Sequence, residues 1–139
     1  LQECATFRNE REDVLAEAVA HAFSPLRDRE DATVLLTSVN DPAAKSIENQ
    51  ITTSLGKQVS RVERDIVIPV GRQVDPNTLV GEDRLLNAAA AVDLLKQACV
   101  VVDAGTAITV DLVDGAGTFH GGAIAAGAQL QLDALNNRT

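Results

Sequence analysis

The sequence has few cysteines and no long apolar run, and both absences narrow the class of protein. Its two cysteines, Cys4 and Cys99, show no C-x-x-C spacing, so nothing indicates a disulfide framework or a cysteine-based zinc site. No apolar run approaches the roughly 20 residues that cross a bilayer, and the start of the chain is not typical of a secretory signal. We therefore expect a cytoplasmic protein with no membrane partner.

The sequence also lacks any cluster of basic residues. Lysine and arginine together number 12 against 20 acidic residues, which gives a formal net charge of -8. Nucleic-acid binding depends on basic side chains that neutralise phosphates, so we expect no nucleic-acid partner. The acidity does not exclude a phosphorylated small molecule, because backbone N–H groups and a bound metal can hold phosphates without many basic side chains.

Methionine, tryptophan and tyrosine are absent as well. At 139 residues the chain is long enough to bury a substantial core. It begins at Leu1 without a methionine and stops within a helical pattern, so we expect both ends to be cut.

Apolar residues recur at helical and at strand spacing in turn, which predicts an α/β protein. Helical spacing indicates helices at residues 9–23, 41–55, 82–96 and after 127. Short apolar, β-branched runs predict strands at residues 32–39, 59–62 and 66–70, a buried strand at 99–103, and a hairpin at 106–113 and 118–124.

Three details refine these elements. Asp41 and Pro42 are typical of an N-cap and a first helical position. Within 106–113, apolar residues alternate with Thr109 and Asp111, which indicates a half-exposed strand. In the last helix we expect three leucines to pack inward, at positions Leu130, Leu132 and Leu135.

The segment V-D-A-G-T-A places Asp103 at the end of a strand, followed by a turn at Gly105 and Thr106. Such a turn exposes backbone N–H groups, and glycine lets a phosphate approach the main chain closely. An ordinary strand connection, in which the carboxylate bonds the turn's own amides, explains the same residues.

The segment V-G-E-D-R places Gly81 before a helix and Glu82, Asp83 and Arg84 in its first turn. Carboxylates at a helix N-terminus are stabilised by the helix dipole, which is a purely structural explanation. A functional interpretation makes Asp83 a general base for a substrate hydroxyl and Arg84 a fork for a substrate carboxylate or phosphate.

A third segment, F-H-G-G-A-I-A-A-G at residues 119–127, concentrates glycines around a strand end. Glycines at these positions would allow close packing beside a ligand or partner. A bulge or a turn in the strand would explain them equally well. We interpret His21 and His120 as partly exposed histidines without a chemical role.

Taken together, G-x-D-R, then V-D-x-G-T-A-x-T-x-D, then G-G-x-I-x-x-G resemble the type III pantothenate kinase family over about residues 33–139. The resemblance implies that Asp83 accepts the proton of the substrate hydroxyl, and that Gly81, Glu82 and Arg84 complete the pantothenate-binding turn. It also implies that Asp103 binds a monovalent cation and that Gly105 and Thr106 contact ATP. Val74 and Ala126 stand where that family commonly has tyrosine and proline.

This resemblance further implies a partial ribonuclease H-like, actin-like ATPase fold, with residues 1–98 as the remainder of a first domain and 99–139 as the beginning of a second. The implied reaction is ATP-dependent phosphorylation of pantothenate to 4'-phosphopantothenate, the first step of coenzyme A biosynthesis. It implies Mg²⁺ with the ATP, K⁺ or NH4⁺ as the monovalent cation, and a homodimer.

The family's N-terminal D-x-G-N-T phosphate loop is absent from this sequence, so we expect this chain alone to be inactive. An alternative is a truncated or non-catalytic relative that acts as a binding or regulatory protein. Failure to bind ATP would favour that alternative.

Overall fold

The computed structural model describes residues 12–137, and the chain divides into two compact units, Leu1–Val67 and Ile68–Thr139. Helices and strands alternate along the chain in both units, which confirms the α/β class. The domain boundary expected after residue 98 falls inside the second unit. These units are defined by contacts within this chain alone, so the assignment of 1–98 and 99–139 to two kinase domains stays a prediction.

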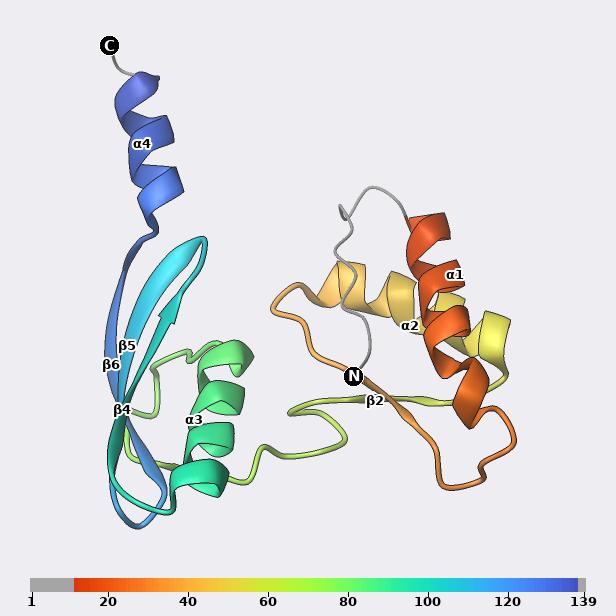
Figure 1. Cartoon of the computed structure of the whole chain (residues 1–139), viewed down its shortest axis with the longest axis horizontal. Helices are drawn as coiled ribbons and strands as arrows, with labels where there is room; N and C mark the ends of the chain where they lie inside the picture. Colours follow the sequence, from red (N-terminus) through yellow and green to blue (C-terminus); the bar gives the residue numbers. More distant parts are fainter. Residues whose placement is uncertain (1–11, 138–139) are drawn as a thin grey trace. The chain divides into compact units, whose positions relative to one another are not determined.

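The first unit pairs two helices with a short parallel sheet. It contains helix α1 (Glu12–Phe23), a 3-10 turn (Ser24–Leu26), β1 (Val34–Leu36), α2 (Asp41–Leu55) and β2 (Val59–Arg61). The two strands run parallel, with Val34 opposite Val59, and α1 lies against α2 (Figure 1). Its buried apolar side chains are Phe23, Ala44, Ile51, Val59 and Val62. The strand expected at residues 32–39 forms, but it is only three residues long.

Helix α2 begins and ends where capping groups are available. Its N-cap is Asn40, whose side-chain oxygen accepts a hydrogen bond from the Ala43 N–H at 3.2 Å, so the prediction of Asp41 as N-cap is wrong by one residue. Asp41 instead lies in the first turn and accepts a 2.8 Å hydrogen bond from Arg61 of β2. The helix stops at Gly56, whose φ of 61° is left-handed and favours glycine.

The strand expected at 66–70 does not form. Asp65 turns the chain instead, because its carboxylate accepts the Arg61 N–H at 2.7 Å, and Ile66 keeps only a single bridge to Val62. Pro69 has no N–H to donate to a ladder. The strand that does form is β3 (Gly71–Arg72), which pairs in parallel with the start of β6.

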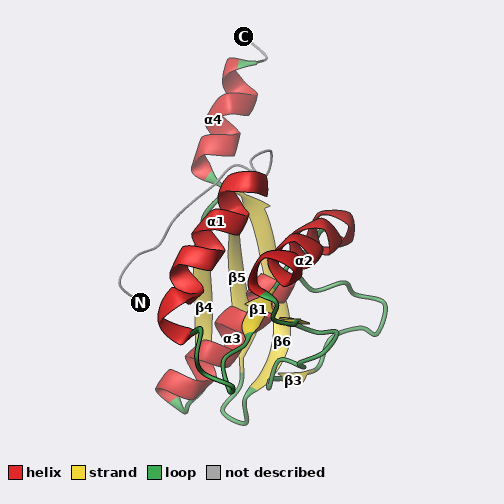
Figure 2. Ribbon diagram, turned by 90° about the vertical axis from the view of Figure 1, so that its right-hand side faces the viewer, coloured by secondary structure: helices red, strands yellow, loops and turns green. Residues whose placement is uncertain are grey.

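The second unit is a four-stranded sheet in the order β3-β6-β5-β4 with one helix on it. Its other elements are α3 (Glu82–Leu95), β4 (Cys99–Ala104), β5 (Ala107–Val113), β6 (Thr118–Ala126) and α4 (Ala128–Asn136). The last three strands are antiparallel neighbours and lie side by side in Figure 2. Helix α3 contacts β4 and β5, so one face of the sheet is covered.

On β5, the polar residues of the alternating pattern lie on the covered face of the sheet. Thr109 and Asp111 are buried together with Val113, whereas Val110 and Leu112 are 40% and 50% exposed. Val100 and Val102 are exposed as well, so the prediction of a buried strand at 99–103 is wrong. The alternation is confirmed, but this sheet buries a carboxylate and leaves valines and a leucine in solvent.

Helix α4 continues from the end of β6 past the β4–β5 turn (Figure 1). Leu130, Leu132 and Leu135 are all exposed, so the prediction that they pack inward is wrong for this chain. At about 100° per residue, Leu132 and Leu135 share a side of the helix, while Leu130 lies on the opposite side. Within residues 12–137, no helix is long and apolar enough to cross a membrane.

The capping role of Asn40 predicts a measurable contribution of this residue to the free energy of unfolding. Asn40→Ala removes the side-chain acceptor for the Ala43 N–H, and we expect it to lower the free energy of unfolding by about 1 kcal/mol in urea denaturation. Asn40→Asp keeps an acceptor and should stay close to the parent. Equal stability of Asn40→Ala and the parent would contradict the assigned cap.

Candidate active site

The start of α3 is arranged around the Asp83 side chain. Gly81 is the N-cap and has an ordinary backbone conformation, so its lack of a side chain has another cause. A Cβ at Gly81 would collide with the Oδ1 atom of Asp83 in its present position. The glycine therefore leaves room for an exposed carboxylate that folds back over the helix start, where the positive end of the helix dipole favours it. Glu82 precedes it in the same turn.

Arg84 lies beneath this turn in a buried ion pair with Asp111 of β5. Their exposed fractions are 9% and 1%. Nε of Arg84 lies 3.1 Å from both carboxylate oxygens, and Nη2 donates to Oδ1. The guanidinium also stacks 5.6 Å from the centre of the Phe119 ring. The hydrogen bonds to Asp111, with a smaller attraction from Asp83, raise the pKa of Arg84 above its usual value.

The glycine pair on β6 makes room for this ion pair. A Cβ at Gly122 would collide with the Val110 carbonyl oxygen and lie 2.8 Å from Oδ1 of Asp111. Gly121 has a φ of 85°, which an L side chain rarely adopts. The close packing that the glycine-rich segment indicated is therefore packing against the Arg84 partner.

A cavity of about 380 Å³ opens beside Arg84. Its lining comes from the loop after β3, the start of α3 and the first half of β6, and consists of Gln73, Val74, Asp75, Thr78, Val80, Arg84, Phe119, His120, Gly121 and Gly122. His120 also contacts Asp114 at 2.8 Å through Nε2. His120, for which the sequence predicted no chemical role, lines the same cavity as Arg84.

Gly127, the last residue of the glycine-rich segment, packs against the turn that follows β4. The Gly127 N–H donates to the Thr106 carbonyl at 2.9 Å, and a Cβ at Gly127 would collide with the Gly105 and Thr106 carbonyls. The Gly105 N–H donates to Ala107 within the turn, so it is not free as the sequence suggested. Across residues 12–137, neither the N–H nor the hydroxyl of Thr106 has a hydrogen-bond partner.

Helix α3 connects the two predicted elements. Asn87, one helical turn after Asp83, donates a 2.9 Å hydrogen bond to Oδ2 of Asp103. Asp103 is exposed and lies near the end of β4, opposite Thr109 of β5. The other expected site residues lie outside the lining of the cavity beside Arg84, namely Gly81, Glu82, Asp83, Asp103, Gly105 and Thr106.

Asp103 supplies one carboxylate, and its Oδ1 accepts no hydrogen bond from the described part of the chain. No group of three or more acidic, histidine or cysteine side chains gathers anywhere in residues 12–137. A single anionic oxygen fits a weakly held monovalent cation better than a divalent ion, which needs several oxygen ligands.

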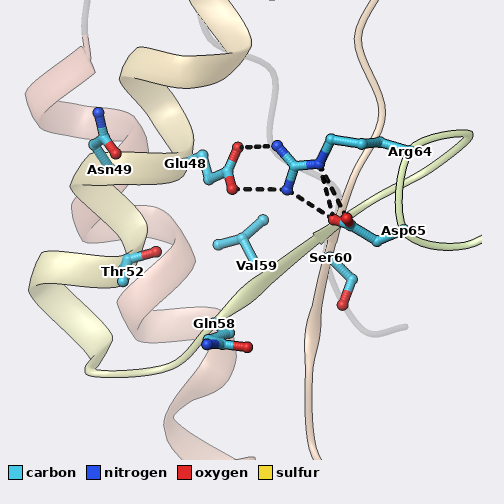
Figure 3. Close-up of a pocket in the computed structure, with 8 residues that line it drawn as sticks. All are labelled: Glu48, Asn49, Thr52, Gln58, Val59, Ser60, Arg64 and Asp65. Carbon is cyan, nitrogen blue, oxygen red and sulfur yellow. Dashed lines mark hydrogen bonds and ion pairs between the residues drawn. The ribbon is translucent and has the colours of Figure 1, made fainter.

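A larger cavity of about 570 Å³ lies in the first unit (Figure 3). Arg64 is the cation among its lining residues, and it already donates to both Glu48 oxygens and to Asp65. The hydrogen bonds that Asp65 accepts from Arg64, together with the one from the Arg61 N–H, lower the pKa of Asp65 to about 2. Because its one cation is neutralised by two carboxylates, this cavity is poorly suited to an anionic substrate.

Three residues of the candidate site were not predicted from the sequence. Asp111 stands in an alternating strand, where a polar residue usually faces solvent, and only the T-x-D end of its motif marked it. Asn87 sits within the helix pattern with no local signal. His120 adjoins the glycine pair, and that position was the available signal for it.

Comparison with known proteins gives a consistent result. The family model described as type III pantothenate kinase matches residues 2–139. A type III pantothenate kinase from Ruegeria pomeroyi is 51% identical over 72 residues, covering 52% of this chain and 28% of the relative. One from Persephonella marina is 33% identical over 105 residues, covering 76% of this chain and 41% of the relative. The chain thus spans less than half the length of these relatives.

The contact between His120 and Asp114 predicts a lowered pKa for the Asp114 carboxyl group. The hydrogen bond from His120, helped by the Thr118 and Ala116 N–H groups, lowers the pKa of Asp114. The stabilisation it brings is therefore complete above the unfolded pKa of about 3.9 and is lost as the pH falls through the lower folded value.

We expect NMR titration of the Asp114 carboxyl carbon to give a midpoint below about 3.9. His120→Ala should move that midpoint upward, although the backbone donors keep part of the shift. A midpoint that stays the same in the variant would contradict the assigned contact.

Proposed function

The chain belongs to the type III pantothenate kinase family, and from this premise we propose that the protein transfers a phosphoryl group from ATP to pantothenate. The product would be 4'-phosphopantothenate, the first intermediate of coenzyme A biosynthesis. The mixed parallel and antiparallel α/β architecture is that expected of the actin-like ATPase fold of this family.

The observation that carries the proposal is the position of Arg84 in the wall of a cavity next to the G-E-D-R turn. Pantothenate has a carboxylate at one end and a primary hydroxyl at the other. A guanidinium suits the carboxylate, because it offers planar, charge-assisted hydrogen bonds. His120, in the same wall, is a second polar group for that end of the substrate.

The chemistry then falls to Asp83. The substrate hydroxyl oxygen attacks the γ-phosphorus of ATP, the bond from that phosphorus to the ADP oxygen breaks, and the hydroxyl proton passes to the Asp83 carboxylate. Asp83 is exposed and held over the helix start by the space at Gly81, which suits a base that meets an incoming ligand.

Phosphoryl transfer depends mainly on positioning and charge neutralisation. Gly105 and Thr106 would contact ATP, and the N–H and hydroxyl of Thr106, which have no hydrogen-bond partner within residues 12–137, support that role. Asp103 would hold K⁺ or NH4⁺. Mg²⁺ would accompany the ATP and neutralise phosphate charge.

We also propose a cytoplasmic homodimer. The cytoplasm is where ATP and vitamin-derived substrates meet. Exposed leucines on both sides of α4 and the exposed valines of β4 leave apolar surface that symmetric pairing would cover.

The catalytic role of Asp83 can be separated from a structural one. Asp83→Asn keeps shape and remains acceptable at a helix start, so its cost in stability should be at most about 1 kcal/mol. Loss of a general base typically lowers the rate about 100-fold to 10,000-fold. We expect kcat of the complete enzyme to fall at least about 100-fold, with little change in Tm.

Glu82→Gln is the matched control, since it removes the neighbouring charge from the same turn. It should keep kcat within a few-fold of the parent. Small and equal losses of kcat in both variants would indicate that Asp83 only stabilises the helix start. A parent that binds neither ATP nor pantothenate by calorimetry would contradict the proposed kinase and favour a non-catalytic relative.

The proposed dimer predicts the mass in solution. Light scattering at micromolar concentration should give twice the monomer mass, because apolar surface on α4 is removed from water by pairing. Leu132→Glu places a charge on the side that Leu132 and Leu135 share and should shift the mass toward the monomer. A parent that scatters as a clean monomer would count against the dimer.

A further inference from the structure

We infer that Asp111 is a positioning residue for pantothenate, which acts by holding the Arg84 guanidinium in the cavity wall. The inference rests on the proposed function, because it concerns how that substrate's carboxylate is bound. Asp111 does not line the cavity beside Arg84, so it is not a catalytic residue. Its effect on the substrate passes through Arg84.

The geometry of the ion pair decides which donors remain for a ligand. A guanidinium has five N–H donors in one plane. Asp111 takes the edge formed by Nε and Nη2, with both carboxylate oxygens 3.1 Å from Nε. The Nη1–Nη2 edge is left, and it can still form two parallel hydrogen bonds to a carboxylate.

The surroundings fix the plane of the guanidinium as well as its edge. The Phe119 ring lies 5.6 Å from Arg84 and supports one face of the group. On the same strand, β6, the missing side chain of Gly122 leaves space for the Asp111 carboxylate. Arg84 is therefore ordered before any ligand arrives, so less side-chain entropy is lost on binding.

Stability alone is a weak reason for this arrangement. A buried ion pair is often no more stabilising than well-packed apolar residues of similar volume, whereas removal of one partner leaves a costly unpaired charge. The same strand face carries Val113, fully buried and apolar, two residues away. A buried carboxylate at this point is better explained by the arginine that it presents to the cavity.

The test is pantothenate affinity by calorimetry in the parent and three variants of the protein. Arg84→Gln and Asp111→Asn each remove one charge of the pair, and the double variant removes both. We expect each single change to weaken binding about tenfold or more, since ordered charge-assisted hydrogen bonds are lost. The double variant should bind within about twofold of Arg84→Gln alone, because coupled residues are non-additive.

Val113→Ala is the control for a purely structural effect on the same strand. It should lower Tm and leave the affinity unchanged. The two single charge variants should also lower Tm, and the double variant should recover part of that loss, because no unpaired buried charge remains. The comparison of the double variant with Arg84→Gln therefore stays available even if Asp111→Asn does not fold.

The outcomes separate the inference from the function it rests on. If the parent binds pantothenate and a folded Asp111→Asn binds it equally well, the inference is overturned and the function stands. A double variant about tenfold weaker than Arg84→Gln would also overturn it, because Asp111 would then act independently. A parent that does not bind pantothenate contradicts the proposed function, and the inference falls with it.

Discussion

The ion pair between Arg84 and Asp111 is the contact on which the second unit depends. It joins the first turn of α3 to the middle of β5 and is almost fully buried at both ends. Such a pair requires good geometry, because each partner loses its hydration. Phe119 and the space at Gly122 supply that geometry from β6. Residues that looked like separate sequence features thus belong to one packed arrangement.

Helix α3 links this ion pair to the candidate base and to the candidate phosphate turn. Asp83 precedes Arg84 directly, Asn87 reaches Asp103 from the next turn, and Val92 packs near Gly117 at the far end of the sheet. A rigid helix held at these points fixes the candidate base relative to the candidate phosphate turn. Phosphoryl transfer needs such positioning, because catalysis comes largely from orientation and electrostatics.

Much of the fold could be predicted from the sequence, since local signals decide it. Gly56 ends α2 in a left-handed conformation, and the Asp114–Gly117 region turns β5 into β6. The buried face of β5 could not be predicted, because alternation gives the period of a strand but not its orientation. Only the tertiary partner Arg84 makes Asp111 the inner residue.

The candidate site divides in the same way. The motif residues from Gly81 to Arg84 and from Asp103 to Thr106 were identified by type and order. Asn87 and His120 were not, because their roles depend on contacts with residues 16 and 6 positions away in the chain. The inward packing of the α4 leucines was wrong because nothing within the described chain covers that helix.

The central claim is that pantothenate binds in the cavity beside Arg84, and amide NMR during a pantothenate titration tests it most directly. The account predicts that shifts concentrate at residues lining that cavity, above all Val74, Arg84, Gly121 and Gly122. Residues lining the cavity in the first unit, such as Thr52 and Ser60, should not move. Shifts confined to that second cavity, or no shifts at saturating pantothenate, would contradict the account.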